Sequence, residues 1–387
     1  MYNKISDINF QDENFKKLVL DLKIDSLAEI TELNCQGYDL VSIDEIKYFP
    51  NLETLIINSY YLETLDLTFN PKLKNITING EGGEELTEID FSENKLLEVL
   101  SLENLVLEEL DLKTNINLKK LFIDGLNEFY DLDLTANINL EEIHLGHMML
   151  SPSLNENNKL LKKIYCSYGP SCEWTETGLP ELEELTLENC ERDSLDVTGL
   201  PKLKKLDITW NQISELDLSH NILLEELSIA DNAFSTINLE KNVNLKSLRL
   251  GGDHDMWSSK IIQHTHLDIT NNSKLTHLYI NNSGLTEVDL SKNVLLKKLY
   301  IVENPIKAIN LSKNILLKNL TIQNTNLESI DLSENKKINY VSLENNELNA
   351  LQFPEVLNIK GFNLSKDKLE EKTINDLINK GFIFDEK

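Results

Sequence analysis

Cysteine and histidine, the side chains most able to bind metals or act as nucleophiles, are few in this 387-residue chain. The four cysteines, Cys35, Cys166, Cys172 and Cys190, have no C-x-x-C spacing, so they predict neither a zinc site nor a redox pair. The Walker loop, H-E-x-x-H, G-x-S-x-G and the Rossmann glycine fingerprint are also absent from the sequence. We therefore expect no enzyme activity and no cofactor.

Two groups of possible metal ligands stand out in the sequence, and the first raises the question of calcium binding. Residues 21–32 have the length of an EF-hand loop, but Lys23 replaces a ligand and Ser26 replaces the required glycine. Ser26 and Glu29 instead predict a capping box on a short helix. Histidines and aspartates also gather between residues 251 and 265, without the spacing of a ligand set. We therefore predict no metal site.

Aspartate recurs along the chain, usually with serine or threonine two residues later. Such side chains accept hydrogen bonds from nearby backbone amides and hold turns. The glycine-rich spacing of calcium-binding rolls is absent, so we predict a turn-forming role. These residues are Asp66, Asp90, Asp111, Asp133, Asp196, Asp217, Asp268, Asp289 and Asp331.

The aspartates belong to a repeat that runs through most of the chain. An A motif, L-x-x-L-x-I-x-x-N-x-I, alternates with a B motif, I-D-L-S-x-N-x-x-L, and both are clearest between Leu285 and Asn324. The A motif has fifteen copies, mostly 21 residues apart, with one step of 30. Its apolar pair begins at residues 33, 55, 76, 100, 121, 143, 164, 185, 206, 227, 248, 278, 299, 320 and 341.

The A motif predicts a short strand with one buried face, because apolar and exposed residues alternate across L-x-L. One coil cannot bury its own leucines, but stacked coils bury them against each other. We therefore predict an α/β-type leucine-rich repeat solenoid with a curved parallel β-sheet of about 15 coils and helical caps. Its predicted parts are an N-terminal cap over 1–32, the solenoid over 33–357 with an insertion at 251–265, and a C-terminal cap over 358–387.

Both ends of the chain contain apolar residues suited to covering the terminal coils. Phe15, Leu18, Val19 and Leu22 have helical spacing, and residues 365–380 predict a second helix. A solenoid needs such caps because its terminal coils otherwise expose leucine side chains to water.

The A motif matches the leucine-rich repeat signature L-x-x-L-x-L-x-x-N/C-x-L in many copies. From about residue 5 to residue 360, the chain resembles bacterial leucine-rich repeat proteins of the internalin-like type with short 21-residue repeats. This resemblance implies that the A motif forms the concave sheet and the B motif the convex side. It also implies a surface or secreted protein that binds other proteins.

Both motifs carry an asparagine that we expect to be buried, where it satisfies backbone groups as the coil turns. In the A motif these are Asn211, Asn232, Asn304 and Asn346, with Cys190 as the substitute. The B motif has a longer series, consisting of Asn70, Asn94, Asn115, Asn137, Asn158, Asn221, Asn242, Asn272, Asn293, Asn314 and Asn335.

Charges that precede the A strands alternate in sign from coil to coil. Since neighbouring coils lie side by side, each glutamate should face lysines, which favours one register even though a single exposed pair contributes only about 0–1 kcal/mol. We therefore interpret the alternation as structural. The residues are Glu53, Lys74, Glu98, Lys119, Lys120, Glu141, Glu142, Lys162, Lys163, Glu183, Glu184, Lys204, Lys205, Glu225, Glu226 and Lys246.

Exposed positions of the A strands become aromatic and histidine-bearing in the middle of the chain. Aromatic residues together with arginine are typical of hot spots in protein interfaces. A tryptophan in the 251–265 insertion is also costly to expose without a partner. We therefore predict a protein-binding module that uses the concave face and the 251–265 loop. The candidate binding residues are Phe122, His144, His147, Tyr165, Tyr168, Trp210, Arg249, Trp257, Tyr279 and Tyr300.

The formal charge of −28, from 65 acidic and 37 basic residues, argues against nucleic acid and anionic membranes as partners. No apolar run reaches the roughly 18–20 residues of a membrane-spanning helix, and we expect a monomer. The start of the chain lacks the apolar run of a signal peptide. This favours a cytoplasmic protein, or a secreted or cell-surface one from which a signal segment was removed.

Two alternative functions follow from these observations. The acidic charge is compatible with a cytosolic inhibitor or immunity-type protein that neutralises a basic partner. The resemblance is compatible with a surface adhesin that binds a host protein or a glycan.

Overall fold

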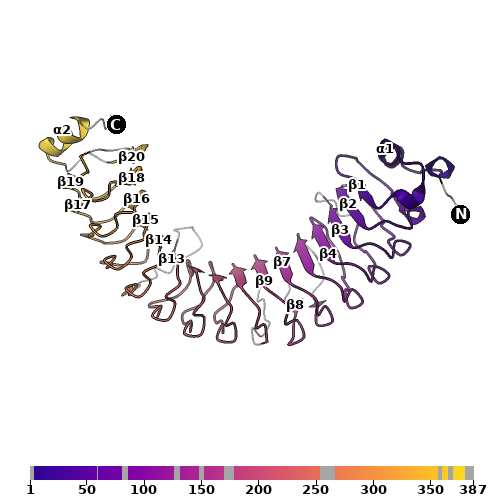
Figure 1. Ribbon diagram of the computed structural model, residues 1–387, viewed down its shortest axis with the longest axis horizontal. Helices are drawn as coiled ribbons and strands as arrows, with labels where there is room; N and C mark the ends of the chain where they lie inside the picture. Colours follow the sequence, from indigo (N-terminus) through magenta and orange to yellow (C-terminus); the bar gives the residue numbers. More distant parts are fainter. Residues whose placement is uncertain are drawn as a thin grey trace. The chain divides into compact units, whose positions relative to one another are not determined.

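The computed structural model describes residues 4–58, 60–80, 86–125, 131–147, 152–169, 178–252, 266–355, 360–364 and 369–379. The chain divides into two compact units, Met1–Glu191 (unit 1) and Arg192–Lys387 (unit 2). Figure 1 shows that each unit is built from stacked coils that contribute one strand after another to a sheet.

Unit 1 begins with short helices and continues as a parallel sheet. The helical elements are η1 (Ile5–Asp7), α1 (Glu13–Asp21), η2 (Leu27–Glu29) and η3 (Asp44–Tyr48). The sheet strands, in spatial order, are β1 (Glu32–Asn34), β2 (Thr54–Asn58), β3 (Asn75–Asn79), β4 (Val99–Glu103), β5 (Lys120–Asp124), β7 (Glu142–Gly146), β9 (Lys163–Ser167) and β10 (Glu184–Glu188). On the B side, β6 (Leu132–Asp133) pairs with β8 (Pro152–Ser153).

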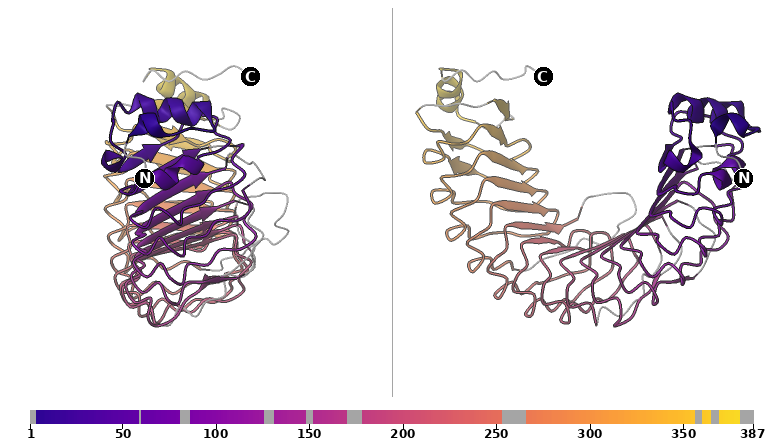
Figure 2. Two further views of the ribbon diagram at one scale, coloured as in Figure 1. Left: turned by 90° about the vertical axis from the view of Figure 1, so that its right-hand side faces the viewer. Right: turned by 45° about the vertical axis from the view of Figure 1, so that its right-hand side comes forward.

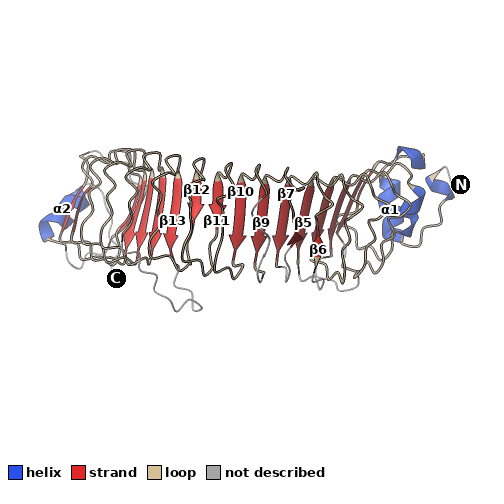
Figure 3. Ribbon diagram, turned by 90° about the horizontal axis from the view of Figure 1, so that it is seen from below, coloured by secondary structure: helices blue, strands red, loops and turns tan. Residues whose placement is uncertain are grey.

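Unit 2 has the same plan and ends with a helix. Its parallel strands are β11 (Lys205–Asp207), β12 (Glu226–Ser228), β13 (Ser247–Gly251), β14 (His277–Asn281), β15 (Lys298–Val302), β16 (Asn319–Gln323), β18 (Tyr340–Ser342) and β20 (Gly361–Asn363). The B-side pair is β17 (Ser329–Asp331) with β19 (Ala350–Gln352), and α2 spans Glu371–Asn379. Figure 3 shows the strands of each unit lying side by side.

The predicted leucine-rich repeat solenoid is confirmed. The A motif forms the long parallel strands, and matching positions of successive coils pair, as Leu55 does with Ile76. Strand β2 alternates buried and half-buried residues, with Leu55 and Ile57 in the core. Within each unit the A strands line the inner side of the curve and the B segments the outer side (Figure 1). We call the inner surface the sheet face.

One strand was not predicted from the repeat. β20 pairs with β18, and Phe362 lies opposite Val341 at the position where earlier coils place leucine or isoleucine. The repeat pattern misses this strand because glycine and phenylalanine replace the usual residues of the motif. The sheet of unit 2 therefore continues into the segment that the sequence assigned to the C-terminal cap.

Buried asparagines connect consecutive coils on the B side, as predicted. Asn94 is inaccessible to solvent, and its Nδ2 donates to the carbonyl oxygens of Leu67 (3.1 Å) and Asn70 (3.0 Å) in the preceding coil. Asn221 makes the same pair of bonds, to Val197 and Leu200, both at 2.9 Å. These carbonyls also accept backbone N–H groups of their own coil, so the asparagine adds a second, inter-coil hydrogen bond to each of them.

The asparagines of the A motif make a second set of connections between coils. The Oδ1 atom of Asn232 accepts a hydrogen bond from the backbone N–H of Ile213 (3.1 Å). Its Nδ2 donates to the carbonyl of Ile208 at 2.7 Å. Asn304 bridges Ser283 and Ile280 in the same way. The predicted burial of these asparagines is therefore confirmed, with Asn346 partly buried.

The recurring aspartates hold turns, as predicted. The Oδ1 atom of Asp66 accepts from the backbone N–H of Thr68 at 3.0 Å and from its hydroxyl at 2.6 Å. Asp196 and Thr198 repeat this geometry in unit 2, at 2.9 and 2.7 Å. The hydroxyl hydrogen bond from Thr198 is the main reason why the pKa of Asp196 lies below its ordinary value.

The alternating charges meet across neighbouring coils. The ammonium of Lys74 lies 2.7 Å from Glu53, and that of Lys162 lies 2.7 Å from Glu141. In unit 2, Lys246 lies 2.6 Å from Glu225. These side chains are about 40–50% exposed, so each pair contributes at most about 1 kcal/mol. The regular spacing of these ion pairs supports the interpretation that the alternating charges favour one register of the coils.

The end helices differ in detail from the sequence analysis. α1 buries Phe15, Leu18 and Val19, and its N-cap is Asp12, whose carboxylate also accepts from the backbone N–H of Val41 (2.7 Å). The predicted capping box at Ser26 is wrong, because Ser26 makes no side-chain cap bond to η2. Figure 2 shows α1, in indigo, at the first coils of unit 1 and α2, in yellow, beyond the last strands of unit 2.

Helix α2 begins later than the sequence indicated. The predicted helix covered residues 365–380, whereas residues 369 and 370 precede the helix and it starts at Glu371. Residues 365–368 and 380–387 lie outside the described part of the chain. In the described ranges, neither α1 nor α2 has the length and apolar character needed to cross a bilayer.

Candidate binding surface on the sheet face

The middle residue of each five-residue A strand points out of the sheet face, because the residues on either side of it are buried. In unit 1 the paired middle residues run Thr77, Ser101, Phe122, His144, Tyr165 and Thr186. Aromatic rings therefore occupy three consecutive strands, β5, β7 and β9. The sequence predicted these three positions, and the register brings them together.

Phe122, His144 and Tyr165 form a row of neighbouring rings on the sheet face. We call these three residues, together with His147 and Tyr168, the unit 1 cluster. The ring centroids of Phe122 and His144 are 4.8 Å apart, and those of His144 and Tyr165 are 5.6 Å apart. These separations match the spacing of about 4.8 Å between adjacent strands, so the sheet itself imposes the stacking. The resulting surface is broad, aromatic and half-exposed.

His147 and Tyr168 form a second stack just beyond the ends of β7 and β9. Their ring centroids are 5.0 Å apart with an interplanar angle of 5°. Both residues have left-handed backbones, with φ of 52° and 55°. The same place after β4 and β10 is taken by Asn104 and Asn189, with φ of 51° and 52°.

Asparagine is the non-glycine residue best suited to this backbone, whereas a bulky aromatic residue there costs about 1–2 kcal/mol. Tyr168 is 43% exposed, so core packing does not compensate for this cost. In unit 2, Trp210 also has a left-handed backbone, with φ of 59°, and is half-buried. Core packing therefore does not explain the aromatic side chain of Tyr168.

Carboxylates surround the unit 1 cluster. The Nε2 atom of His144 lies 2.9 Å from Glu142, and the Nδ1 atom of His147 lies 2.9 Å from Asp124. Burial would raise the pKa of Glu142, but hydrogen bonds from Lys120 and His144 hold it below its ordinary value. Each histidine of this cluster therefore lies beside a carboxylate, and Glu142 also pairs with Lys120 at 2.9 Å.

The phenol of Tyr165 responds to the same acidic surroundings. A hydrogen bond with Ser167 acts to lower its pKa, but burial and the charges of Glu188 and Asp124 outweigh that bond. The pKa of Tyr165 is therefore raised, and the phenol remains protonated near neutral pH. It can act as a hydrogen-bond donor to a ligand.

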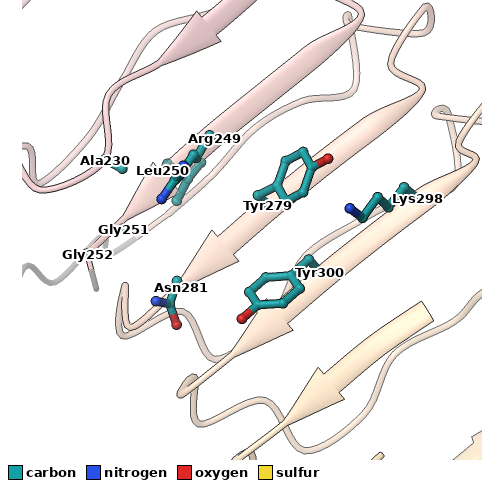
Figure 4. A pocket seen from close by; sticks show the side chains of 9 residues that line it. All are labelled: Ala230, Arg249, Leu250, Gly251, Gly252, Tyr279, Asn281, Lys298 and Tyr300. Atoms are coloured by element: carbon teal, nitrogen blue, oxygen red, sulfur yellow. The ribbon is translucent and has the colours of Figure 1, made fainter. Parts of the chain in front are cut away.

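A second aromatic group lies in unit 2 and has a different charge. Arg249, Tyr279 and Tyr300 are paired middle residues of β13, β14 and β15. The two tyrosine rings are 6.2 Å apart, and the ammonium of Lys298 lies 5.0 Å from the centroid of Tyr279. We call these four residues the unit 2 cluster. Figure 4 shows their side chains together on one face of the sheet.

The unit 2 cluster lines a shallow hollow of about 250 Å³. Its remaining wall consists of Ala230, Leu250, Gly251, Gly252 and Asn281. Gly251 has φ of 90°, and a Cβ atom there would overlap the carbonyl oxygen of Asn281. Only glycine fits at this point, so the shape of the hollow depends on it.

A neighbouring hollow of about 350 Å³ extends the first one across the sheet face. It shares Arg249 and Tyr279 with the first hollow and continues over β11 and β12, where it is lined by Lys205, Asp207 and Glu226. Together the two hollows form a groove over five consecutive strands, β11 to β15.

Around the start of β14, nearby lysines make the groove positively charged. His277 is the first residue of β14, and burial is the main cause that lowers its pKa. The charges of Lys298 and Lys297 lower it further. This histidine is therefore neutral at physiological pH, and the lysines supply the positive charge.

Nine of the ten predicted binding residues lie in the described ranges, and all nine are exposed or half-buried. The structure groups eight of them in the two clusters and places Trp210 separately. Trp257 and residues 253–265 of the insertion lie outside the described part. Lys298 was not predicted as a binding residue. It is the first residue of β15, directly before the apolar pair that begins at Leu299, and it is half-buried.

None of the described cysteines belongs to either cluster. Cys35, Cys166 and Cys190 are buried and form no disulfide, and burial raises the pKa of Cys35 to about 12. Over the described ranges, no three His, Cys, Asp or Glu side chains are arranged to hold a metal ion. Cys172 lies outside these ranges.

Solved structures resemble this chain in fold, although neither a protein-family model nor a curated protein matches its sequence. A leucine-rich repeat protein of Leptospira interrogans has a TM-score of 0.78 at 21% identity, over 94% of this chain and 97% of that chain. The functional domain of InlJ from Listeria monocytogenes, which includes a cysteine ladder, has a TM-score of 0.69 at 24% identity, over 87% and 78%.

A third structure, the internalin InlF from Listeria monocytogenes, has a TM-score of 0.58 at 19% identity, over 95% of this chain and 99% of that chain. At these identities the similarity concerns the fold. The chain has the leucine-rich repeat architecture, and these bacterial neighbours include an internalin.

Proposed function

We propose that the protein is a protein-binding leucine-rich repeat module whose sheet face contacts the partner. The observation that carries the proposal is the His147–Tyr168 stack, where two exposed rings occupy left-handed backbone positions that suit asparagine. Residues that are unfavourable for the fold and exposed to solvent are best explained by a role in binding. The unit 2 cluster supplies a second contact area on the same kind of surface.

The chemistry of both clusters is that of interface hot spots. Tyrosine, tryptophan and arginine dominate such sites, and a central one typically contributes 2 kcal/mol or more when a partner excludes water from it. Stacking between neighbouring rings also limits their rotation, so less conformational freedom is lost on binding. Trp257 in the 251–265 loop remains a proposed contact residue.

Site-specific photo-cross-linking tests this proposal. A benzophenone side chain is introduced at Tyr168 or Tyr279, and at Ile222 as a control, because Ile222 is 53% exposed but belongs to the B motif. In extract from the native host, we expect a discrete protein adduct from both sheet-face positions and none from the control. Adducts from Ile222 alone, or from no position, would refute the proposal.

A basic partner is the second candidate, and the acidic surroundings of the unit 1 cluster favour it. Asp124 and Glu142 lie beside the two histidines, and the charge of Glu188 acts on Tyr165. A complex held by these charges should weaken strongly as salt rises from 0.05 to about 1 M, because the screening length falls to about 3 Å. Binding that is undiminished in molar salt would count against this candidate.

A further inference from the structure

The groove of unit 2 collects positive charge on a chain whose formal charge is −28. Two cations, Arg249 and Lys298, line the hollow between β13 and β15, and no aspartate or glutamate is among the described residues that line it. The adjoining hollow shares Arg249 and adds Lys205, Asp207 and Glu226, so the two hollows together have three cations and two carboxylates. Lys298 lines only the hollow that has no carboxylate in its wall, and the excess positive charge therefore lies at the β13–β15 end.

The side chains of this end are arranged to receive an anionic group. Lys298 lies over the face of Tyr279, which orients its ammonium on the sheet face. Arg249 is exposed on β13, two strands away, and its planar guanidinium is of the kind that suits a carboxylate. The phenols of Tyr279 and Tyr300 add two neutral donors beside these charges.

The dimensions of the groove fit an extended peptide rather than a small ion. Five strands at a spacing of about 4.8 Å span about 19 Å, which corresponds to about six extended residues. Tyrosine rings give the chain of such a peptide an apolar surface to lie on. The cationic end then fixes which part of the peptide bears the acid.

We propose that the unit 2 groove binds an extended segment of the protein partner and that Arg249 and Lys298 receive an acidic side chain of that segment. This proposal rests on the proposed protein-binding function. The net negative charge of the chain does not prevent such contact, because charges more than about 8–10 Å away are screened at physiological salt. The nearer carboxylates, Asp207 and Glu226, lie on the β11 and β12 side of Arg249, so the acidic group is received on the side of Lys298.

Selection from a displayed library of random hexapeptides on the full chain tests this proposal. We expect aspartate or glutamate to be enriched at one position. A synthetic peptide of the selected sequence is then titrated by fluorescence anisotropy. Replacing its acidic residue with the matching amide should weaken binding by about tenfold, as for the loss of one charge-assisted hydrogen bond.

The Arg249→Gln and Lys298→Gln variants should each weaken the same peptide by about tenfold and weaken its amide analogue much less. Lys274→Gln and Lys336→Gln are matched controls, because they remove one positive charge from exposed positions outside the groove. They should leave the affinity unchanged. Thermal unfolding of all four variants verifies that they fold.

The outcomes separate this proposal from the wider one. Selected peptides without acidic residues, whose affinity still depends on Tyr279 and Tyr300, would overturn the carboxylate assignment and leave the protein-binding function intact. Acidic peptides that bind Arg249→Gln and Lys298→Gln as tightly as the original chain would also overturn it. A selection that enriches no peptide at all would overturn the groove as a peptide site, and the cross-linking experiment would then decide the function independently.

Discussion

At the scale of single residues, the sheet face is distinguished by side chains that do not suit their backbone. Asn104 and Asn189 show what the fold itself favours after an A strand, because asparagine tolerates a positive φ. His147 and Tyr168 occupy the same place in neighbouring coils and stack on each other. Their aromatic character is therefore an indication of function that a burial analysis alone would miss.

The double substitution His147→Asn with Tyr168→Asn should leave stability nearly unchanged while weakening partner binding. The left-handed backbone becomes more favourable by about 1 kcal/mol per residue, and this offsets the lost stacking of about 0.5–1.5 kcal/mol. Urea unfolding measures the balance, and we expect a change within about 1 kcal/mol. A loss above about 3 kcal/mol would show that the pair serves packing instead.

At the scale of elements, the buried asparagines of the B motif donate hydrogen bonds from each coil to the preceding coil. The Nδ2 of Asn221 donates second hydrogen bonds to the carbonyls of Val197 and Leu200, and its side chain is inaccessible to water. Asn244 makes a similar single bond to Ile222 at 2.8 Å, but in an exposed position. The two asparagines therefore form a matched pair for testing the cost of burial.

Asn221→Ala should lower the free energy of unfolding by about 2–4 kcal/mol, because two buried hydrogen bonds between coils are lost and a cavity replaces the amide. Asn244→Ala should cost less than about 1 kcal/mol, since water can take over its bond. Chemical unfolding followed by circular dichroism checks both values. Equal losses for the two variants would contradict the account of the buried asparagines.

The strands were predictable from the sequence because a leucine or isoleucine recurs at nearly every buried position of the A motif. β20 was not predicted because Phe362 stands where the repeat has an aliphatic residue and Gly361 precedes it. The capping box at Ser26 failed for a different reason. Asp12 already anchors the N-terminal helix to the segment at Val41, and η2 is only a three-residue turn.

The candidate site was predictable only in part. Pattern alone placed Phe122, His144 and Tyr165 on one face, because the register of a repeat aligns equivalent positions. The hollow in unit 2 depends on contacts between residues about 30 positions apart, such as Gly251 against Asn281. The orientation of Lys298 over Tyr279 likewise follows from strand neighbours rather than from sequence spacing.

At the scale of the whole molecule, the recurring aspartates of the B motif have a structural role in turns. Six B-motif aspartates have lowered pKa values, chiefly because a serine or threonine two residues later donates to them. They are Asp66, Asp133, Asp196, Asp217, Asp268 and Asp289. Their carboxylates are therefore better stabilised in the folded chain than in the unfolded one.

The free energy of unfolding should accordingly fall in acid. Each group has a lower pKa when folded, so its contribution is complete above the unfolded value of about 3.9 and is lost as the pH drops through the folded value. Urea midpoints measured between pH 7 and pH 3 should decline mainly below about pH 5. The Asp196→Asn variant lacks one of these carboxylates, so its free energy of unfolding should decline slightly less in acid. A free energy of unfolding that is constant or increases as the pH falls would contradict the turn-forming role.

The two aromatic clusters also divide the molecule by charge, with carboxylates around the one in unit 1 and cations beside the one in unit 2. A partner that touches both would need basic residues opposite the first and acidic residues opposite the second. Its affinity would then depend on the pattern of charge on the partner rather than on its total charge.

The most direct test of the central claim is the affinity of the cross-linked partner, once purified, for sheet-face variants measured by titration calorimetry. Tyr168→Ala and Tyr279→Ala should each reduce affinity by about 30-fold or more, corresponding to a hot-spot loss of about 2 kcal/mol. Ile222→Ala, on the B side, should leave affinity unchanged. Unaltered affinity in both tyrosine variants, or a loss confined to Ile222→Ala, would contradict binding through the sheet face.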